Sequence, residues 1–314
     1  MSAAPDTTPA GGGRVLCVGL SCLDHVWRVE RFPPLASRTD ASAYRVQGGG
    51  PAATAAVAAA RLGVRARLVA LHGDDPAGEL LLAELEGSGV DVSGVRRLPG
   101  ARTFVSAVLV APDGERWIFP YRGSGLRDSP EWLGGVTVTA ADVVLVDLRH
   151  PELCVAAAQA ARRAGAAVVA DFGDLRHFDH APLADHLLVS RECAAELLGR
   201  DEPEAALPRL RGRPGQVAGI TLGADGLLLD DGEGTTHVPA PPVDAVDTTG
   251  AGDVFHGAYA AGLARGLAAR DAGAYGVAVA AMACRAFGSR AGIPTDAEAR
   301  AFMRAAMPGR RLPA

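Results

Sequence analysis

The chain has 314 residues, 48% of them apolar, and a formal net charge of −5. That length accommodates one large α/β domain or two small ones, while the acidic balance and the lack of a basic run argue against a nucleic-acid partner. No apolar stretch reaches the length of a membrane span without a charge or a glycine, so we expect no membrane association. Residues 1–13 lack a basic segment followed by an apolar one, which predicts a disordered tail rather than a secretory signal.

The lysine and cysteine contents restrict the chemistry further. The sequence contains no lysine and no asparagine, so the lysine-dependent phosphate sites of P-loop proteins and protein kinases are excluded. Any phosphoryl transfer here must rely on backbone amides, arginine and metal. The five cysteines show no paired spacing, which indicates reduced thiols in a cytoplasmic enzyme.

The N-terminal region predicts a buried strand, a loose segment and a helix opened by glycine. Residues 14–20 form a short apolar run that ends in glycine, typical of a buried first strand. Asp24 follows at its carboxyl end, where open α/β sheets place ligands, with a turn cap as the alternative. Residues 26–47, which include Arg38, predict lid strands joined by a loop. The glycines at 48–50 then open an alanine-rich helix, and their N–H groups could meet substrate hydroxyls.

The middle of the chain changes its pattern twice. Residues 103–110 and 115–121 alternate polar and apolar side chains about a Pro-Asp-Gly turn, which predicts an antiparallel hairpin and a lid segment near 101–122. From residue 142 onward, apolar runs alternate with helical segments, which predicts a parallel sheet with helices on both faces. Three histidines between 177 and 186 invite a metal-site interpretation, but their spacing gives it no further support, and a solvated loop is preferred.

Residues 246–253, Val-Asp-Thr-Thr-Gly-Ala-Gly-Asp, carry the strongest chemical signal. Gly250 and Gly252 flank Ala251 where a helix begins, so free N–H groups and the helix dipole offer an anion site that a phosphate could approach closely. Asp253 stands in the first turn, where the positive helix end favours its ionised form, and it could accept a proton from an attacking hydroxyl. These features indicate phosphoryl transfer. An ordinary helix cap followed by a close-packed Gly/Ala helix is the alternative.

Three features follow one another in an order that identifies a family. The glycine pair at 48–49, the turn at 221–226 and the octet at 246–253 together resemble the PfkB/ribokinase family of carbohydrate kinases. The resemblance runs from about residue 14 to the C-terminus and implies one kinase domain over 14–314. It also implies a ribokinase-like three-layer α/β/α fold with a mostly parallel central sheet, a small β-sheet lid and a homodimer formed through the lids.

The resemblance assigns roles to particular residues and implies ATP as the phosphoryl donor. The implied catalytic residues are the base Asp253 and the anion hole of Gly250, Ala251 and Gly252. The implied sugar-hydroxyl binders are Asp24, Gly48 and Gly49. The implied nucleotide site comprises Ser190, Thr221, Gly223, Gly226, Gly288 and Gly292. The family's Asn-x-x-Glu motif aligns with Ser-Arg-Glu-Cys at 190–193, so we expect no metal-binding side chain, and Mg²⁺ to arrive with ATP, held mostly by phosphates and water.

Within the family, the chain is most similar to the branch that phosphorylates the 1-hydroxyl of 6-deoxy-6-sulfofructose. Thr54 replaces the asparagine usual in the family's Gly-Gly motif, as it does in that branch. The lysine, asparagine and arginine that hold the sulfonate there correspond to Arg38, Pro120 and Arg149, and a proline has no N–H to donate. The similarity implies a ketose with a 6-anion, bound by Arg38, Thr54 and Arg149. The alternatives are a family kinase for fructose, a fructose phosphate, ribose or a nucleoside, and a non-catalytic sugar-binding regulator.

Overall fold

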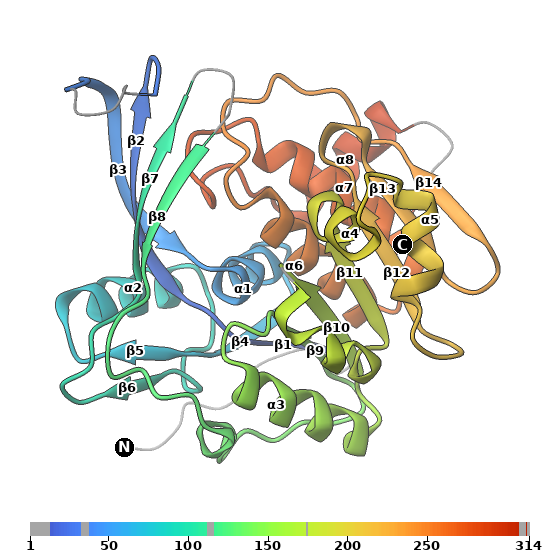
Figure 1. Ribbon diagram of the computed structural model, residues 1–314, viewed down its shortest axis with the longest axis horizontal. Helices are drawn as coiled ribbons and strands as arrows, with labels where there is room; N and C mark the ends of the chain where they lie inside the picture. The colour runs from blue at the N-terminus through green and yellow to red at the C-terminus, as the bar shows by residue number, and fades with distance from the viewer. Residues whose placement is uncertain (1–12, 33–37, 112–115, 174, 308–311, 313–314) are drawn as a thin grey trace.

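The computed structural model describes residues 13–32, 38–111, 116–173, 175–307 and 312, so most of the predicted tail and the predicted turn at 112–114 lie outside the described residues (Figure 1). None of the described helices is long and apolar enough to cross a membrane. The strands are β1 Arg14–Val18, β2 Cys22–Val29, β3 Ala41–Gly49, β4 Arg65–Val69, β5 Leu71–Gly73, β6 Arg96–Leu98, β7 Val105–Val110, β8 Arg116–Tyr121, β9 Val143–Val146, β10 Ala167–Phe172, β11 His186–Ser190, β12 Val217–Thr221, β13 Leu227–Asp230 and β14 Thr235–Val238. The α-helices are α1 Pro51–Arg61, α2 Pro76–Gly87, α3 Pro151–Ala164, α4 Arg191–Leu198, α5 Pro203–Leu210, α6 Ala251–Ala264, α7 Ala269–Ala283 and α8 Asp296–Ala306.

The central sheet has eight strands in the order β14-β13-β12-β11-β10-β9-β1-β4. The strands from β12 to β4 pair in parallel, as the alternation of apolar runs and helices predicts. Their carboxyl ends therefore share one edge, the edge at which open α/β sheets bind ligands. β13 and β14 pair antiparallel and extend the sheet beyond β12, on the side opposite β4. The sequence gives no clear signal for β14, because its four residues include a single buried side chain.

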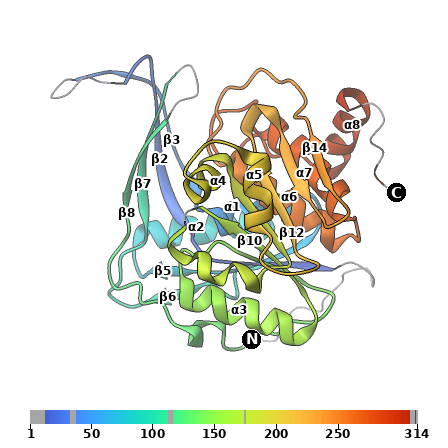
Figure 2. The same cartoon turned by 45° about the vertical axis from the view of Figure 1, so that its right-hand side comes forward.

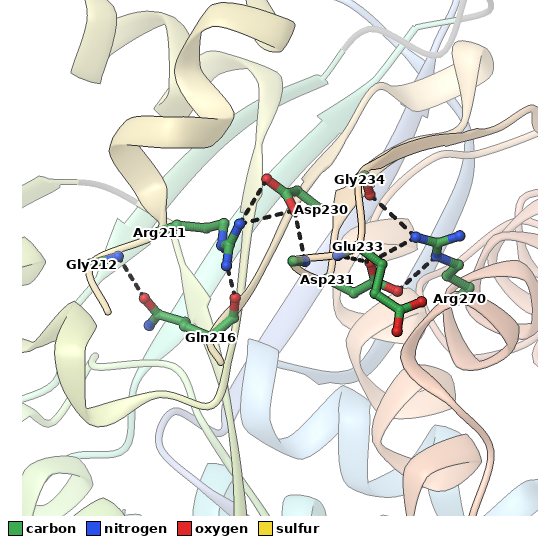
Figure 3. Close-up of polar contacts among 9 residues, drawn as sticks. Arg211, Gly212, Gln216, Asp230, Asp231, Glu233, Gly234 and Arg270 are labelled. Carbon is green, nitrogen blue, oxygen red and sulfur yellow. Dashed lines mark hydrogen bonds and ion pairs between the residues drawn. The ribbon is translucent and has the colours of Figure 1, made fainter. Parts of the chain in front are cut away.

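Ion pairs attach the hairpin of β13 and β14 to the rest of the domain (Figure 3). Arg211, which follows α5, donates from Nη1 to both carboxylate oxygens of Asp230, at 3.2 and 3.3 Å. Arg270 on α7 donates from Nε to Asp231 Oδ2 at 2.7 Å, and this bond lowers the pKa of Asp231. Because charge-assisted hydrogen bonds are stronger than neutral ones, the two arginines fix the edge hairpin against α5 and α7.

Apolar residues on both faces of the central sheet form the three layers. Within β1, Val15 and Cys17 belong to the apolar core that includes residues of α1, α6, α7 and α8, whereas Leu16 and Val18 belong to the core that includes residues of α3, α4 and α5. All four side chains are fully buried. A strand that is apolar on both faces must be covered on both faces, so the three-layer α/β/α fold expected from the sequence is confirmed.

The two helices that glycine turns open, α1 and α6, lie side by side. Gly257 of α6 faces α1 so closely that a β-carbon would overlap the carbonyl oxygen of Ala55. Glycine and alanine thus let the two backbones approach directly. As a result, Pro51 and Ala251 at the starts of these helices line one pocket.

A separate four-stranded sheet, which we call the lid sheet, has the order β3-β2-β7-β8. β2 pairs antiparallel with β3 and parallel with β7, and β7 forms an antiparallel hairpin with β8. Figure 2 shows this sheet standing beside the central domain. Asp24, which the sequence places at the end of the first strand, lies inside β2, so lid strand β2 begins earlier than residue 26.

Candidate active site

The turn before α6 has the tight geometry that its glycines predict. Gly250 has a left-handed backbone (φ 74°, ψ 6°), and a β-carbon there would lie 2.8 Å from the Ser289 β-carbon. Glycine is therefore needed at this position. The buried carboxylate of Asp247 accepts the N–H groups of Thr249 (2.8 Å) and Gly288 (2.9 Å). These bonds fix the turn against the loop that follows α7.

The N-terminus of α6 offers backbone N–H groups to an anion. The Ala251 N–H is bonded to the Thr248 carbonyl oxygen at 3.2 Å, so it is already used within the turn. The next two N–H groups, of Gly252 and Asp253, have no intrahelical acceptor at these positions. A β-carbon on Gly252 would meet no atom within 4 Å. An anion can therefore reach the backbone on this side.

The carboxyl group of Asp253 has a strongly shifted acidity. Burial, followed by the nearby carboxylates of Asp171 and Asp147, raises the pKa of Asp253 to about 8. The helix end favours the ionised form, as expected from the sequence, but the loss of water and the like charges act in the opposite direction and outweigh it. A carboxyl group with a pKa near physiological pH is suited to act as a general base.

His256 connects the first turn of α6 to the neighbouring strands. Its Nδ1 lies 2.7 Å from the Gly252 carbonyl oxygen and 3.5 Å from Oδ2 of Asp171, at the end of β10. Its Nε2 lies 3.3 Å from the carbonyl oxygen of Leu188 in β11. The side chain is buried, so it holds the start of α6 and Asp171 in fixed relative positions.

A pocket of about 390 Å³, which we call the lid pocket, lies between the lid sheet and the starts of α1 and α6. It brings together most of the catalytic and sugar-binding residues expected from the sequence. These are Asp24, Gly49, Thr54, Arg149, Gly250, Ala251, Gly252 and Asp253. The lid strands β7 and β8 and the residues next to them contribute further lining residues that the sequence did not single out, namely Phe104, Ser106, Val108, Arg116, Ile118 and Arg122. Most of them lie at alternate positions along β7 and β8. The alternation of the predicted hairpin could therefore have indicated which side chains share one face of the lid.

Asp24 and Gly49 lie against each other in the lid pocket. A β-carbon on Gly49 would overlap the Asp24 carboxyl group, so the glycine makes room for the acid. The Cys22 thiol donates to Asp24 Oδ1 at 3.3 Å. Burial raises the pKa of Asp24. A buried carboxyl group beside an open pocket can accept hydrogen bonds from the hydroxyls of a ligand.

Arg38, in contrast, is exposed and does not line the lid pocket. It precedes β3 in the loop beyond the Val29–Ala41 pair, whereas Asp24 pairs with Gln47 near the other end of the same two strands. The expectation that Arg38 and Arg149 converge on one ligand is therefore wrong for a single chain. Strand spacing explains the error, because each residue of an extended strand moves a side chain about 3.3 Å further from the pocket.

A buried arginine supports the turn at Gly48 and Gly49. Arg290 donates to the Gly49 carbonyl oxygen (2.9 Å), to Thr54 Oγ1 (3.2 Å) and to Glu84 Oε1 (2.9 Å). The other oxygen of Glu84 accepts the Gly48 N–H at 2.5 Å. Gly48 is thus bonded within the protein and does not line the lid pocket, contrary to its expected role as a sugar-hydroxyl binder. Thr54 lines the pocket while its hydroxyl serves this network.

A second pocket, of about 520 Å³, lies on the other side of the α6 turn, and we call it the helix pocket. Thr221, Gly223 and Gly226 line it as the sequence predicts. Its other walls are mainly apolar, from the loop after β14 and from α6 and α7. Ala251 and Gly252 line both pockets. The two pockets therefore meet at the α6 turn, beside Asp253.

Three expected nucleotide-site residues lie outside the helix pocket. Ser190 accepts a backbone N–H of α4 at 3.2 Å and caps that helix. The Gly288 N–H is bonded to Asp247. A β-carbon on Gly292 would overlap the carbonyl oxygen of Ala283, so this glycine allows close packing on α7. In each case the small residue meets a backbone requirement rather than lining the pocket.

The residues near Asp253 fit a cation that brings its own ligands. Arg191 is paired with Asp201 (Nε–Oδ1 2.9 Å) and Ser190 caps α4, so these two side chains are already engaged within the protein. Among the described residues, no three His, Cys, Asp or Glu side chains are arranged to hold a metal ion. Asp171 and Asp253 supply carboxylate oxygens, the donors that Mg²⁺ prefers. They could meet a Mg²⁺ ion already bound by phosphates and water.

Comparisons with known proteins agree with this geometry. A model described as the pfkB family of carbohydrate kinases matches residues 13–296, and the chain belongs to this family. An ATP-dependent ribose-1-phosphate kinase from Halopiger xanaduensis is 34% identical over 253 residues, which cover 79% of this chain and 84% of the relative. A solved structure of a candidate ribokinase from Agrobacterium tumefaciens superimposes with a TM-score of 0.84 at 34% identity, over 94% of this chain and 98% of the other.

A third relative was solved with its ligands. Aminoimidazole riboside kinase from Salmonella enterica, in complex with aminoimidazole riboside and an ATP analogue, has a TM-score of 0.78 at 27% identity, over 93% of this chain and all of the other (100%). The predicted family, ribokinase-like fold and carbohydrate-kinase class are thus confirmed. The relatives named here are described by ribose-type substrates and give no support for 6-deoxy-6-sulfofructose in particular.

Proposed function

We propose that the protein transfers the γ-phosphoryl group of ATP to a primary hydroxyl of a sugar that bears an anionic group at its other end. The observation that carries the proposal is the place of Asp253 at the junction of the two pockets, with Arg149 in the same lid pocket. A ketose phosphorylated at its 1-hydroxyl and carrying a 6-anion, such as 6-deoxy-6-sulfofructose, is one sugar of this kind.

The lid pocket supplies the acceptor side of the reaction. Asp24 accepts hydrogen bonds from sugar hydroxyls, and the reacting hydroxyl faces Asp253, which takes its proton. The hydroxyl oxygen forms a bond to the γ-phosphorus as the bond from that phosphorus to the β-γ bridging oxygen breaks, and ADP leaves. The N–H groups of Gly252 and Asp253 donate to the oxygens of the transferring group, where charge is concentrated in the transition state.

The helix pocket supplies the donor side. Its apolar walls suit the adenine ring, and the phosphates would extend toward Gly252, which both pockets share. A relative solved with an ATP analogue and another described as ATP-dependent support ATP as the donor. Asp171 and Asp253 are the carboxylates that could hold Mg²⁺, which when bound would neutralise charge on the phosphates.

A kinase for a neutral sugar or a nucleoside is the second candidate. The observation in its favour is the set of ribose-type names among the relatives. A non-catalytic sugar-binding regulator is the third. It has little in its favour, because a protein that only binds a sugar has no need of a carboxyl group such as Asp253 beside the open backbone at Gly252.

An ADP-release assay with the purified chain, ATP and Mg²⁺ tests the proposal. The panel pairs anionic sugars with neutral ones: 6-deoxy-6-sulfofructose and fructose 6-phosphate with fructose, ribose 1-phosphate with ribose, and a nucleoside alone. We expect at least one anionic sugar to have a higher kcat/KM than its neutral partner. A higher kcat/KM for every neutral sugar would refute the anionic-substrate proposal, and no turnover with any acceptor would refute the kinase proposal.

We also propose that two copies associate through the outer face of the lid sheet, opposite the lid pocket. That face carries five large apolar side chains that are between 40% and 56% exposed, Tyr44, Val46, Trp117, Phe119 and Tyr121. Large exposed apolar side chains gathered on one face mark interaction surfaces. We place the reaction in the cytoplasm, in keeping with five cysteines that are all free thiols.

A further inference from the structure

A small hollow adjoins the lid pocket. Arg122 and Arg149 line both spaces, and Arg176 and His177 line only the hollow. At about 80 Å³, against about 390 Å³ for the lid pocket, the hollow accommodates a single small group rather than a whole sugar. A molecule in the lid pocket could therefore extend one substituent into it.

The charges that face the hollow are mainly positive. Three arginines line it, together with one carboxyl group, that of Asp147. Backbone N–H groups already surround this carboxyl group: those of Leu20 (2.8 Å) and Ala52 (3.1 Å) reach Oδ2, and that of Arg149 (2.9 Å) reaches Oδ1. Burial raises the pKa of Asp147. The hollow thus favours an anion, and its guanidinium groups can bond two oxygens at once.

The backbone around Arg149 is shaped to direct its side chain into this place. Leu148 has a left-handed backbone (φ 53°), a conformation that costs about 1–2 kcal/mol for an L-residue other than glycine. On the opposite wall, a β-carbon on Gly173 would lie 2.5 Å from Arg149 Nη2. The left-handed backbone of Leu148 and the absence of a side chain at Gly173 therefore both set the position of this guanidinium group.

We propose that this hollow, lined by Arg122, Arg149 and Arg176, binds the anionic substituent of the acceptor sugar, and that the substituent is a phosphate ester. The proposal rests on the proposed kinase function and names the substrate class, a sugar phosphate. It replaces Arg38, which lies outside the pocket, with Arg122 and Arg176. Three guanidinium groups line the hollow, and a phosphate ester offers them three terminal oxygens and up to two negative charges, one more than a sulfonate monoanion.

The test compares a phosphorylated sugar with its neutral parent in the full-length protein. Arg176→Ala is the main variant, because Arg176 lines only the hollow. Its ratio of kcat/KM for the sugar phosphate to kcat/KM for the neutral sugar should fall about 10- to 100-fold, the range for a lost hydrogen bond to a charged group. Gly173→Ala, which displaces the Arg149 guanidinium, should lower the same ratio. Arg163→Ala, exposed on α3, is the control and should leave the ratio unchanged.

Each outcome bears on the proposal. An unchanged ratio of the two kcat/KM values in an Arg176→Ala protein that is folded by circular dichroism would overturn it. A wild-type kcat/KM that is higher for 6-deoxy-6-sulfofructose than for both fructose 6-phosphate and ribose 1-phosphate would also overturn it. If no acceptor releases ADP, the kinase function fails separately, and calorimetry with inorganic phosphate still tests the hollow. Phosphate should then bind the wild type about 10-fold or more tightly than Arg176→Ala, and equal affinities would refute the site.

Discussion

Arg116, on lid strand β8, donates a hydrogen bond from Nη1 to the hydroxyl of Thr248 across 3.1 Å. Arg116 lines the lid pocket and Thr248 lines the helix pocket. The bond therefore crosses the junction at which phosphoryl transfer is proposed, and it ties the lid sheet to the turn before α6. In a chain without lysine, this guanidinium is placed to stabilise charge on the transferring group.

We expect Arg116→Ala to lower kcat/KM about 10- to 100-fold, the loss of one charge-assisted hydrogen bond in the transition state. The melting temperature should change little, because exposed polar contacts add at most about 1 kcal/mol to stability. Arg116→Lys, which keeps the charge but loses the planar fork, should recover part of the activity. Arg162→Ala, exposed on α3, serves as the control. ADP release and thermal unfolding provide the two readouts, and wild-type kcat/KM in Arg116→Ala would show that the bond has no catalytic role.

Asp253→Asn tests the base. Asparagine keeps the shape of the side chain but cannot accept the proton, so kcat should fall by roughly two to four decades. The affinity for the sugar, measured by calorimetry, should change little, since asparagine keeps the size of the side chain and one of its acceptor oxygens. Near wild-type turnover in this variant would remove Asp253 from the mechanism.

The acidity of Asp253 predicts opposite pH trends for activity and stability. Its pKa is raised to about 8 in the folded protein, so the ionised base becomes more abundant, and kcat/KM rises, as the pH approaches about 8. Between the ordinary carboxyl pKa of about 4 and about 8, the folded state keeps a proton that the unfolded state has released. The free energy of unfolding therefore falls as pH rises across this window. Asp253→Asn has no carboxyl proton to lose, so its stability should not fall in this way, and its melting temperature relative to that of wild type should increase from pH 5 to pH 8. A difference in melting temperature that stays constant over this range would contradict the raised pKa of Asp253.

The sequence predicted the parts of the site that depend on local backbone chemistry. The turn at Gly250 and the start of α1 are set by glycine, proline and small residues within a few positions of one another, and such patterns are readable from the chain. The alternation of strands and helices likewise set the layers of the fold. The sequence also predicts Asp24 as a ligand-binding residue, because a carboxylate after an apolar run marks the carboxyl end of a strand. It does not predict that Asp24 lies within β2, because one residue carries no information on which strands pair.

The positive hollow could not be read in the same way. Arg149 and Arg176 follow β9 and β10, which are neighbours in the central sheet, but Arg122 follows lid strand β8, so the packing of the lid sheet on the central sheet is needed to bring all three together. No sequence spacing records that contact. The prediction for Arg38 was wrong because the sequence does not show how far the strands β2 and β3 extend from the pocket.

Phe119→Asp tests the proposed dimer. Phe119 is 56% exposed on the outer face of the lid sheet, so a charge there should leave the fold of one chain intact but oppose association of two apolar faces. Light scattering should report the dimer mass for wild type and the monomer mass for the variant. Leu80→Asp is the matched control, since Leu80 on α2 is also 56% exposed and lies outside the lid sheet. A wild-type protein that is monomeric at micromolar concentration would exclude a stable interface.

Substitutions at Gly252 and Gly250 should separate catalysis from folding. A β-carbon at Gly252 meets no atom within 4 Å, and valine has a higher helix propensity than glycine, so Gly252→Val should fold with a melting temperature close to that of wild type. Its branched side chain would nevertheless occupy the side on which phosphate reaches the backbone, and turnover should drop by about two decades or more. Gly250→Val is different, because it combines a left-handed backbone (φ 74°) with a β-carbon 2.8 Å from that of Ser289. This variant should lose stability first, by about 1–3 kcal/mol or more. Thermal unfolding and ADP release on both proteins distinguish the two effects, and normal kinetics in folded Gly252→Val would mean that phosphate binds elsewhere.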